Sequence, residues 1–157
     1  MDTGTTPPTV SITSPLDGAE VFEGSTLPIT LSATDDVAVA SVNFLFDGEE
    51  VSTDNAPPYQ FNYRVPVGIT SFAIGATAID LANNIGAARN VFVTVLPDPP
   101  PVVNITSPAN GATFVEGSTI AISATATDNV SVTKVEFLIN GAVVATDTTS
   151  PYQYDYN

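Results

Sequence analysis

Apolar and polar residues alternate along most of the first 96 positions of this chain, with short turn-like stretches in between. Alternation with a period of two is typical of half-buried β-strands. The alternating positions predict seven short strands, at residues 10–12, 27–33, 42–46, around 51, 59–65, 72–78 and 91–95. The pair Asp47–Gly48 predicts a tight turn after the third of them. Short strands in this number, without any helical period, predict an all-β antiparallel sandwich of two sheets.

The sequence of residues 7–64 recurs 93 positions later, at residues 100–157, without a gap and with about half of the positions identical. An internal repeat of this kind indicates tandem copies of one domain. We expect a disordered N-terminal segment at residues 1–6, a complete domain at 7–96, a proline-rich linker at 97–101 and an incomplete domain at 102–157. Residues that are 93 positions apart are called counterparts below.

The two copies share the motifs "ITSP", "EGST", "ATD" and "PYQ" in the same order and spacing, and the first copy continues through "FAIGATAIDLANN". In these residues the chain resembles the bacterial immunoglobulin-like (Big-type) domains that occur as tandem repeats in secreted and cell-surface proteins. The resemblance covers nearly the whole chain. It implies two tandem immunoglobulin-like antiparallel β-sandwiches and an extracellular, non-catalytic role in a bacterial protein.

The second copy has no counterparts of the sixth and seventh strands, which in an immunoglobulin-like order pair beside the third. The third strand of the second copy should therefore present Val135, Phe137 and Ile139 to an open core and leave backbone groups unpaired. One explanation is that the chain is a piece of a longer protein. The other is that strands from another molecule complete the domain, as in a strand-exchanging fibre subunit. "MDTGTTPP" is a poor donor for such exchange, because it lacks alternating apolar residues.

Composition removes several classes of function. The net charge is −14, from 17 acidic residues against three basic ones, so a nucleic-acid backbone would be repelled. The chain has no cysteine and no histidine, which excludes disulfides, thiol nucleophiles, imidazole bases and zinc sites built from those residues. Neither a membrane span nor a signal peptide is predicted. We expect a mature or excised piece of an exported protein.

Acidic and amide side chains follow two of the predicted strands, and these strand ends should lie at the same end of the sandwich. The residues are Asp35, Asp36, Asp80, Asn83 and Asn84. Clustered carboxylate and amide oxygens on loops are typical ligands of Ca²⁺. The alternative is that each side chain accepts hydrogen bonds from backbone N–H groups of its own turn. No cofactor is required by either interpretation.

A second candidate calcium site lies at the joint between the copies. The linker residue Asp98 should come near Asp128 and Asn129, because the first strand of the second copy begins at the end where these two residues lie. Stalk proteins of the cadherin type hold calcium in a comparable place. The second copy lacks the sixth-strand loop that would supply further ligands.

No constellation of residues supports catalysis, and adjacent carboxylates such as Glu49 and Glu50 do not straddle a substrate. The leading hypothesis is a structural spacer of an adhesin, stalk or fibre, with neighbouring repeats of the same or another chain as partners. The alternative is a polysaccharide-binding or linker module of a secreted polysaccharide-degrading enzyme. Tyr59, Tyr63, Tyr152 and Tyr156 could stack on sugars, although they follow the alternation of the core face and packing is the favoured interpretation.

Overall fold

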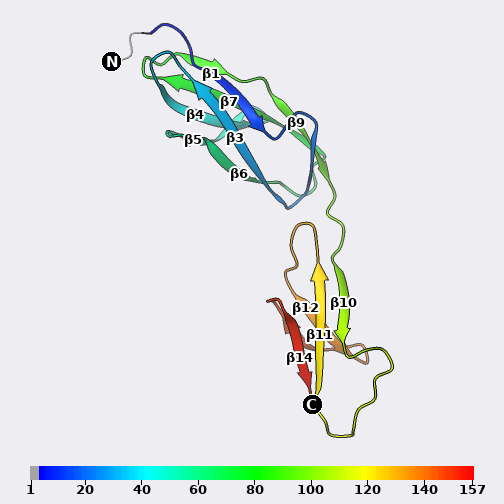
Figure 1. Ribbon diagram of the computed structural model, residues 1–157. Coiled ribbons are helices and arrows are strands. Elements are labelled where there is room, and N and C mark those ends of the chain that lie inside the picture. The colour runs from blue at the N-terminus through cyan, green and yellow to red at the C-terminus, as the bar shows by residue number, and fades with distance from the viewer. Residues whose placement is uncertain (1–3) are drawn as a thin grey trace. The chain divides into compact units, whose positions relative to one another are not determined.

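A computed structural model describes residues 4–157 of the chain, which divide into two compact units, the first ending at Pro97 and the second running from Asp98 to Asn157 (Figure 1). Within the described residues there is no helix, so the predicted all-β class is confirmed. Part of the segment predicted to be disordered, residues 1–3, lies outside the described residues. Within the rest of that segment, the Gly4 carbonyl accepts a hydrogen bond from the Asn84 side chain.

The first unit is a sandwich of two sheets. Its strands are β1 (Thr9–Ser14), β2 (Ala19–Phe22), β3 (Thr26–Thr34), β4 (Val39–Phe46), β5 (Glu49–Asp54), β6 (Gln60–Arg64), β7 (Ser71–Asp80), β8 (Ile85–Ala87) and β9 (Val91–Leu96). One sheet has the order β1-β3-β6, and it lies over a larger sheet of order β2-β9-β7-β4-β5 in which β8 also pairs with β7 (Figure 1). All neighbours are antiparallel except β2 and β9. The predicted turn is confirmed, since Asp47 and Gly48 both have positive φ.

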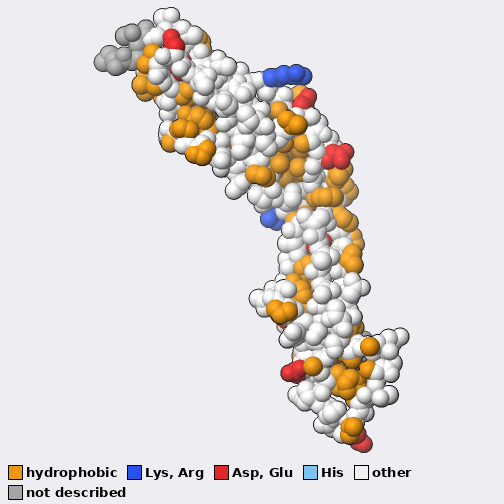
Figure 2. All heavy atoms as spheres, in the orientation of Figure 1, with side chains coloured by type: hydrophobic (Ala, Val, Ile, Leu, Met, Phe, Trp, Pro, Cys, Tyr) orange, Lys and Arg blue, Asp and Glu red, His pale blue; other side chains and the backbone are white. Residues whose placement is uncertain are grey.

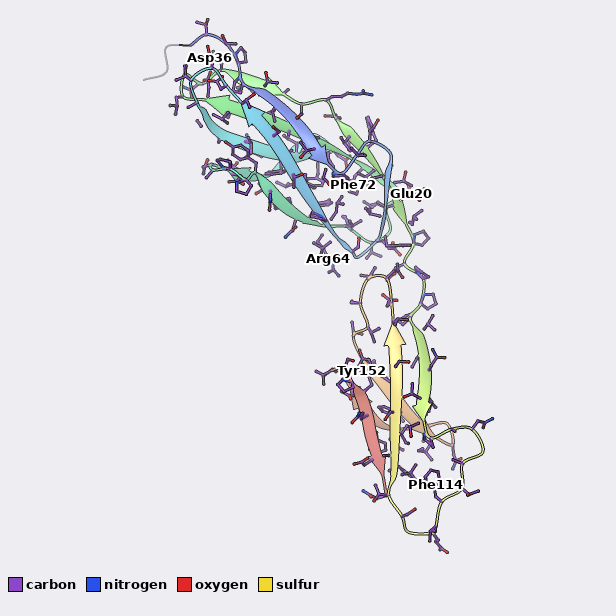
Figure 3. All side chains as sticks on the ribbon, in the orientation of Figure 1. Glu20, Asp36, Arg64, Phe72, Phe114 and Tyr152 are labelled. Carbon is purple, nitrogen blue, oxygen red and sulfur yellow. The ribbon has the colours of Figure 1, made fainter. Side chains whose placement is uncertain are left out.

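The core of this unit consists of the alternate residues that face inward from both sheets. The largest fully buried apolar side chains are Phe44, Ile29, Ile74, Val42, Val65 and Val93. Around them a group of aromatic rings packs between the sheets. The rings of Phe46 and Tyr63 are stacked, with 3.6 Å between their centroids. Figure 3 shows Phe72 within the sandwich, and only 4% of this residue is exposed. The period-two pattern therefore places the core as the sequence predicts.

Two strands of the first unit were not predicted, so the expectation of seven strands was wrong: its described residues, 4–97, form nine. Strand β2 has only four residues and pairs in parallel with β9, with Ala19 opposite Val93 and Phe22 opposite Leu96. Strand β8 has three residues beside β7. Both segments are too short to show a period of two, and each becomes a strand only because an edge of β9 or β7 supplies backbone partners.

The second unit has two smaller sheets. Its strands are β10 (Val102–Ser107), β11 (Ile120–Thr127), β12 (Val135–Ile139), β13 (Ala142–Asp147) and β14 (Tyr152–Tyr156). They form a sheet of order β10-β11-β14 and a hairpin of β12 and β13. The pairing repeats that of β1, β3, β6, β4 and β5, with the same registers after the shift of 93 residues. Within residues 98–157 no strand occupies the places that β7 and β9 have in the first unit.

The expectation that Val135 and Phe137 of β12 face an open core is wrong. Val135 and Phe137 are each only 5% exposed, and they form a small core with Ala124 and Tyr152. The sheet of β10, β11 and β14 covers their side chains from one side, so these two residues do not face an open core. The other edge of β12 pairs with no strand among the described residues, and Ile139 is only half-buried.

Candidate functional site

The first calcium candidate begins in the loop between β3 and β4. The Asp35 Oδ1 atom accepts hydrogen bonds from the backbone N–H groups of Val37, at 3.0 Å, and Ala38, at 3.1 Å. Its Oδ2 atom is buried and has no hydrogen-bond partner within residues 4–157. Asp36 is exposed on the same loop (Figure 3). Asp35 therefore has a turn-forming role that occupies one of its two oxygens.

Asp80 ends β7 and is only 2% exposed. Its Oδ1 atom accepts the backbone N–H groups of Ala82 and Asn84, both at 2.8 Å, and its Oδ2 atom accepts the Asn84 side-chain amide at 2.6 Å. Burial raises the pKa of this carboxyl. The hydrogen bonds from the side chain and backbone of Asn84, and from the backbone of Ala82 and Asn83, outweigh that effect and hold the pKa below its ordinary value.

The structure brings part of the predicted calcium set to one end of the first unit. Val39, just after the Asp35 loop, is the direct partner of Asp80 in the β4–β7 pairing. Asn84 lies against Asp80, whereas Asn83 is exposed and has a φ of 70°. No group of three or more acidic side chains positioned to hold a metal occurs within residues 4–157. The hydrogen bonds show the turn-forming role, and calcium binding stays a prediction.

The second calcium candidate lies in the second unit. Asp128 repeats the arrangement of Asp35, since its Oδ1 atom accepts the N–H groups of Val130 and Ser131, both at 2.8 Å, and its Oδ2 atom is buried without a partner among the described residues. Asp128 and Asn129 border a shallow depression together with Pro99 and Pro100. The linker that follows Asp98 thus runs close to the other two predicted ligands. Calcium binding here also stays a prediction.

The four tyrosines considered as sugar-stacking residues are all buried or half-buried. Tyr59 and Tyr152 are 7% exposed, and Tyr63 and Tyr156 are half-buried. Burial, with the charge of Asp47 nearby, raises the pKa of the Tyr63 hydroxyl. The interpretation as packing residues is confirmed for Tyr59, Tyr63 and Tyr152, which lie in or against the two cores.

Sequence reasoning missed the structural role of further acidic residues. The Asp54 carboxylate accepts the N–H groups of Ala56 and Gln60, and its counterpart Asp147 accepts those of Thr149 and Gln153. The bonds from Thr149 and Gln153 lower the pKa of Asp147 further than its burial raises it. The recurrence of aspartate at an offset of 93 residues was the available signal.

The second unit has a groove of about 640 Å³ between β12 and the sheet that contains β10 and β11. It lies where β7 and β9 pack in the first unit. Val103, Ile105, Phe137 and Ile139 are among its lining residues. Figure 2 shows hydrophobic side chains gathered at this end of the second unit, and Figure 3 places Phe114 on the loop between β10 and β11.

Comparisons with known proteins agree with this architecture. The profile of the bacterial Ig domain family matches residues 8–85 and 101–157. No curated protein matches the chain significantly. Among solved structures, the fibronectin(III)-like modules of Clostridium thermocellum CbhA are 24% identical, with 94% of this chain and 78% of that chain covered and a TM-score of 0.54. At this identity the likeness shows the fold alone.

Two further structures are more distant. A chimeric titin Z1Z2 tandem is 19% identical, with 90% of this chain and 74% of that chain covered and a TM-score of 0.48. The D00–D0 domains of intimin are 18% identical, with 93% and 83% covered and a TM-score of 0.39.

Proposed function

This chain belongs to the bacterial Ig domain family, and we propose that it is a non-catalytic spacer of an extracellular or cell-surface bacterial protein, of the adhesin, stalk or fibre type. A domain of this family with this fold is consistent with a structural or linker module. Residues 4–157 contain no helix with the length and hydropathy of a transmembrane span.

The observation that carries the proposal is the role of the polar residues that both copies retain. Asp35 and Asp128 close the same turn, and Asp54 and Asp147 close another, with backbone N–H groups as their partners in both units. Ser25 and Ser118 likewise donate to the carbonyls of Phe22 and Val115. The polar residues that the two copies share thus stabilise turns of the fold. Shared residues with a structural role are expected of the interchangeable units of a spacer.

The aromatic residues give independent support. All five tyrosines are buried or half-buried. The exposed phenylalanines of the described chain are Phe92, at 61%, and Phe114, at 49%, and they do not occupy counterpart positions. A polysaccharide-binding module expects several exposed rings in a row, because sugars stack on aromatic faces. No observation in the structure favours that alternative over the spacer.

Retention on polysaccharides tests the proposal. The full chain should show no saturable retention on soluble or insoluble polysaccharides, including cellulose, xylan and chitin, in affinity electrophoresis or pull-down. Phe92→Ala and Phe114→Ala variants should behave like the unchanged chain. Saturable binding to one polysaccharide that is lost in either variant would overturn the spacer and establish the binding module.

A further inference from the structure

Several residues that line the groove of the second unit are counterparts of residues in or against the core of the first. Its lining residue Val103 is 58% exposed, whereas the counterpart Val10 is 7% exposed. Ile105 is 70% exposed, whereas Ile12 is half-buried against the core of the first unit. The residue types are unchanged, so the difference arises from what covers them. In the first unit the cover includes β7, which contacts β1 as well as β4.

The edge of β12 is also complementary to a strand. In the first unit β4 pairs with β5 on one side and with β7 on the other, with Phe46 opposite Ile74, Phe44 opposite Ala76 and Val42 opposite Ala78. In the second unit β12 pairs with β13 alone among the described strands. Its second edge therefore has backbone N–H and C=O groups available for a further antiparallel strand.

We infer that the groove of the second unit is a strand-acceptor site that binds an extended segment of the β7–β9 type, supplied from outside residues 4–157. The segment runs antiparallel to β12. Three positions of the segment point inward, opposite Ile139, Phe137 and Val135. The first carries a larger apolar side chain and the other two carry small ones. In the first unit these places are occupied by Ile74, Ala76 and Ala78. This is recognition by β-strand addition, in which backbone pairing supplies affinity and side-chain size supplies selectivity.

An outward position defines the segment further. Gly75 is the direct partner of Leu45, and a Cβ atom built on Gly75 would lie 3.5 Å from the Leu45 Cβ and 3.1 Å from the Asn90 side chain. The counterpart Leu138 is 54% exposed. A Cβ at the place of Gly75 would make only ordinary van der Waals contact with Leu45, so the position opposite Leu138 accepts alanine as well as glycine.

The second strand of the segment has its own receptor. In the first unit β2 pairs with β9, whereas the counterpart residues 112–115 form no strand and include the exposed Phe114 and Val115. A β9-type strand beside a bound β7-type strand gives these residues a backbone partner. One occupant thus covers both the open edge of β12 and residues 112–115.

A second copy of this chain does not supply the segment. Its β7 lies between β4 and β9, with partners on both sides, so donating β7 would require the first unit to unfold. The occupant is therefore a separate segment of the stated pattern.

Binding of a synthetic peptide with the sequence of residues 69–97 to the full chain tests the inference. We expect saturable 1:1 binding, measured by fluorescence anisotropy of the labelled peptide. With free peptide at about 100 times its dissociation constant, amides of residues 135–139 should exchange about 100-fold more slowly. Amides of β4 in the same molecule provide an internal control and should not change. A peptide with Phe72→Asp and Ile74→Asp should not bind.

A matched pair of protein variants separates groove binding from unspecific association. Val103 and Val102 are 58% and 61% exposed, so aspartate at either position is compatible with the folded second unit. Val103 lines the groove and Val102 does not. Val103→Asp should weaken peptide binding about 100-fold or more, because an unpaired charge would be covered, and Val102→Asp should not.

Three results would overturn the inference. The first is an absence of binding by the peptide. The second is equal binding of the aspartate-substituted peptide or equal loss in both protein variants, since either indicates unspecific apolar association. The third is protection of residues 135–139 that rises with protein concentration in the absence of peptide, because sedimentation would then identify a second copy as the occupant.

Discussion

At the scale of single residues, Asp80 connects the end of β7 to the N-terminal part of the chain. It accepts the Asn84 side-chain amide, and the same amide donates to the Gly4 carbonyl at 3.2 Å. Asp80 is almost fully buried and yet its pKa is held below the ordinary value by these hydrogen bonds and those from the following backbone. Its ionised form is therefore the form that the folded state favours.

The pH dependence of unfolding should show this preference. Because the folded-state pKa of Asp80 is lowered, its contribution to stability is complete above the unfolded pKa, near 3.9, and is lost as the pH falls through the folded value. As the pH falls from about 6 to about 2, the melting temperature should decline less for Asp80→Asn than for the unchanged chain. Asp36→Asn, at an exposed position, provides the control and should keep the full decline. Identical pH profiles for Asp80→Asn and the unchanged chain would contradict this role.

Gly86 marks the closest approach between β8 and the start of the chain. A Cβ atom built there would lie 1.8 Å from the Pro8 carbonyl oxygen, which belongs to backbone and cannot turn aside. We expect Gly86→Ala to lower the free energy of unfolding of the first unit by about 1–3 kcal/mol. Gly75→Ala should cost less, because its nearest neighbour is the Asn90 side chain at 3.1 Å. Urea unfolding of both variants measures the difference, and equal losses would contradict the close contact.

Calcium binding by the Asp35 and Asp80 loops can be decided by melting curves. If the predicted ligands bind Ca²⁺, the melting temperature of the first unit rises with calcium and falls back when the ion is chelated. The rise should be absent in Asp35→Ala and in Asp80→Ala. A melting temperature that does not respond to calcium would leave these carboxylates with the turn-forming role that their hydrogen bonds show.

At the scale of elements, the two copies show how a partner decides whether a segment is a strand. Residues 17–26 read "DGAEVFEGST" and residues 110–119 read "NGATFVEGST", so the local patterns are nearly the same. The first contains β2, paired with β9. The second is irregular, and both Phe114 and Val115 are exposed. Local preference is equal in the two places, and the pairing with β9 makes the difference.

Proline substitution at counterpart positions should reproduce that difference. Glu20 is exposed and pairs with Thr94, so Glu20→Pro should destabilise the first unit by about 1–3 kcal/mol, because proline removes an N–H group and restricts φ within a paired strand. The counterpart change, Thr113→Pro, lies in the irregular segment and should alter stability by no more than about 0.5 kcal/mol. Differential scanning calorimetry of both variants tests this. Equal effects would mean that β2 contributes little to the first unit.

At the scale of the whole molecule, the two units should differ in cooperativity. The second unit has a buried core of four residues, Ala124, Val135, Phe137 and Tyr152, whereas the core among residues 4–97 has sixteen. Small apolar cores supply little net stability. We therefore expect amides of residues 135–139 to exchange quickly and those of residues 39–46 slowly in the same chain.

Covalent addition of the missing strands should remove that difference. A chain extended after Asn157 by a copy of residues 65–96 should show slow exchange at residues 135–139 and a second cooperative unfolding transition. The added segment buries about six to eight apolar side chains, each worth about 1.5–3 kcal/mol before the entropy of ordering is subtracted. An extension of the same length with aspartate at the positions of Phe72, Ile74, Val91 and Val93 provides the control. Slow exchange in both extended chains would contradict the assignment of the groove.

The sequence by itself determined the parts of this protein that depend on local pattern. Period-two alternation placed Val42, Phe44, Ile74 and Val93 in the core, because successive side chains of a strand point to opposite faces. The Asp47–Gly48 pair determined a hairpin turn through its positive φ angles. The recurrence of the pattern after 93 residues also indicated which strands of the two copies correspond.

Tertiary structure decided the features that depend on a partner strand or on the other sheet. Val10 and Val103 have the same pattern around them, but only Val10 is buried, because β7 covers it. Val135 and Phe137 are buried although β7 has no counterpart there, since the sheet containing β11 and β14 packs over them. Whether Asp35, Asp80 and Asn84 meet likewise depends on the β4–β7 register rather than on their spacing in sequence. Burial and backbone pairing belong to pairs of segments, and a single segment's pattern does not contain them.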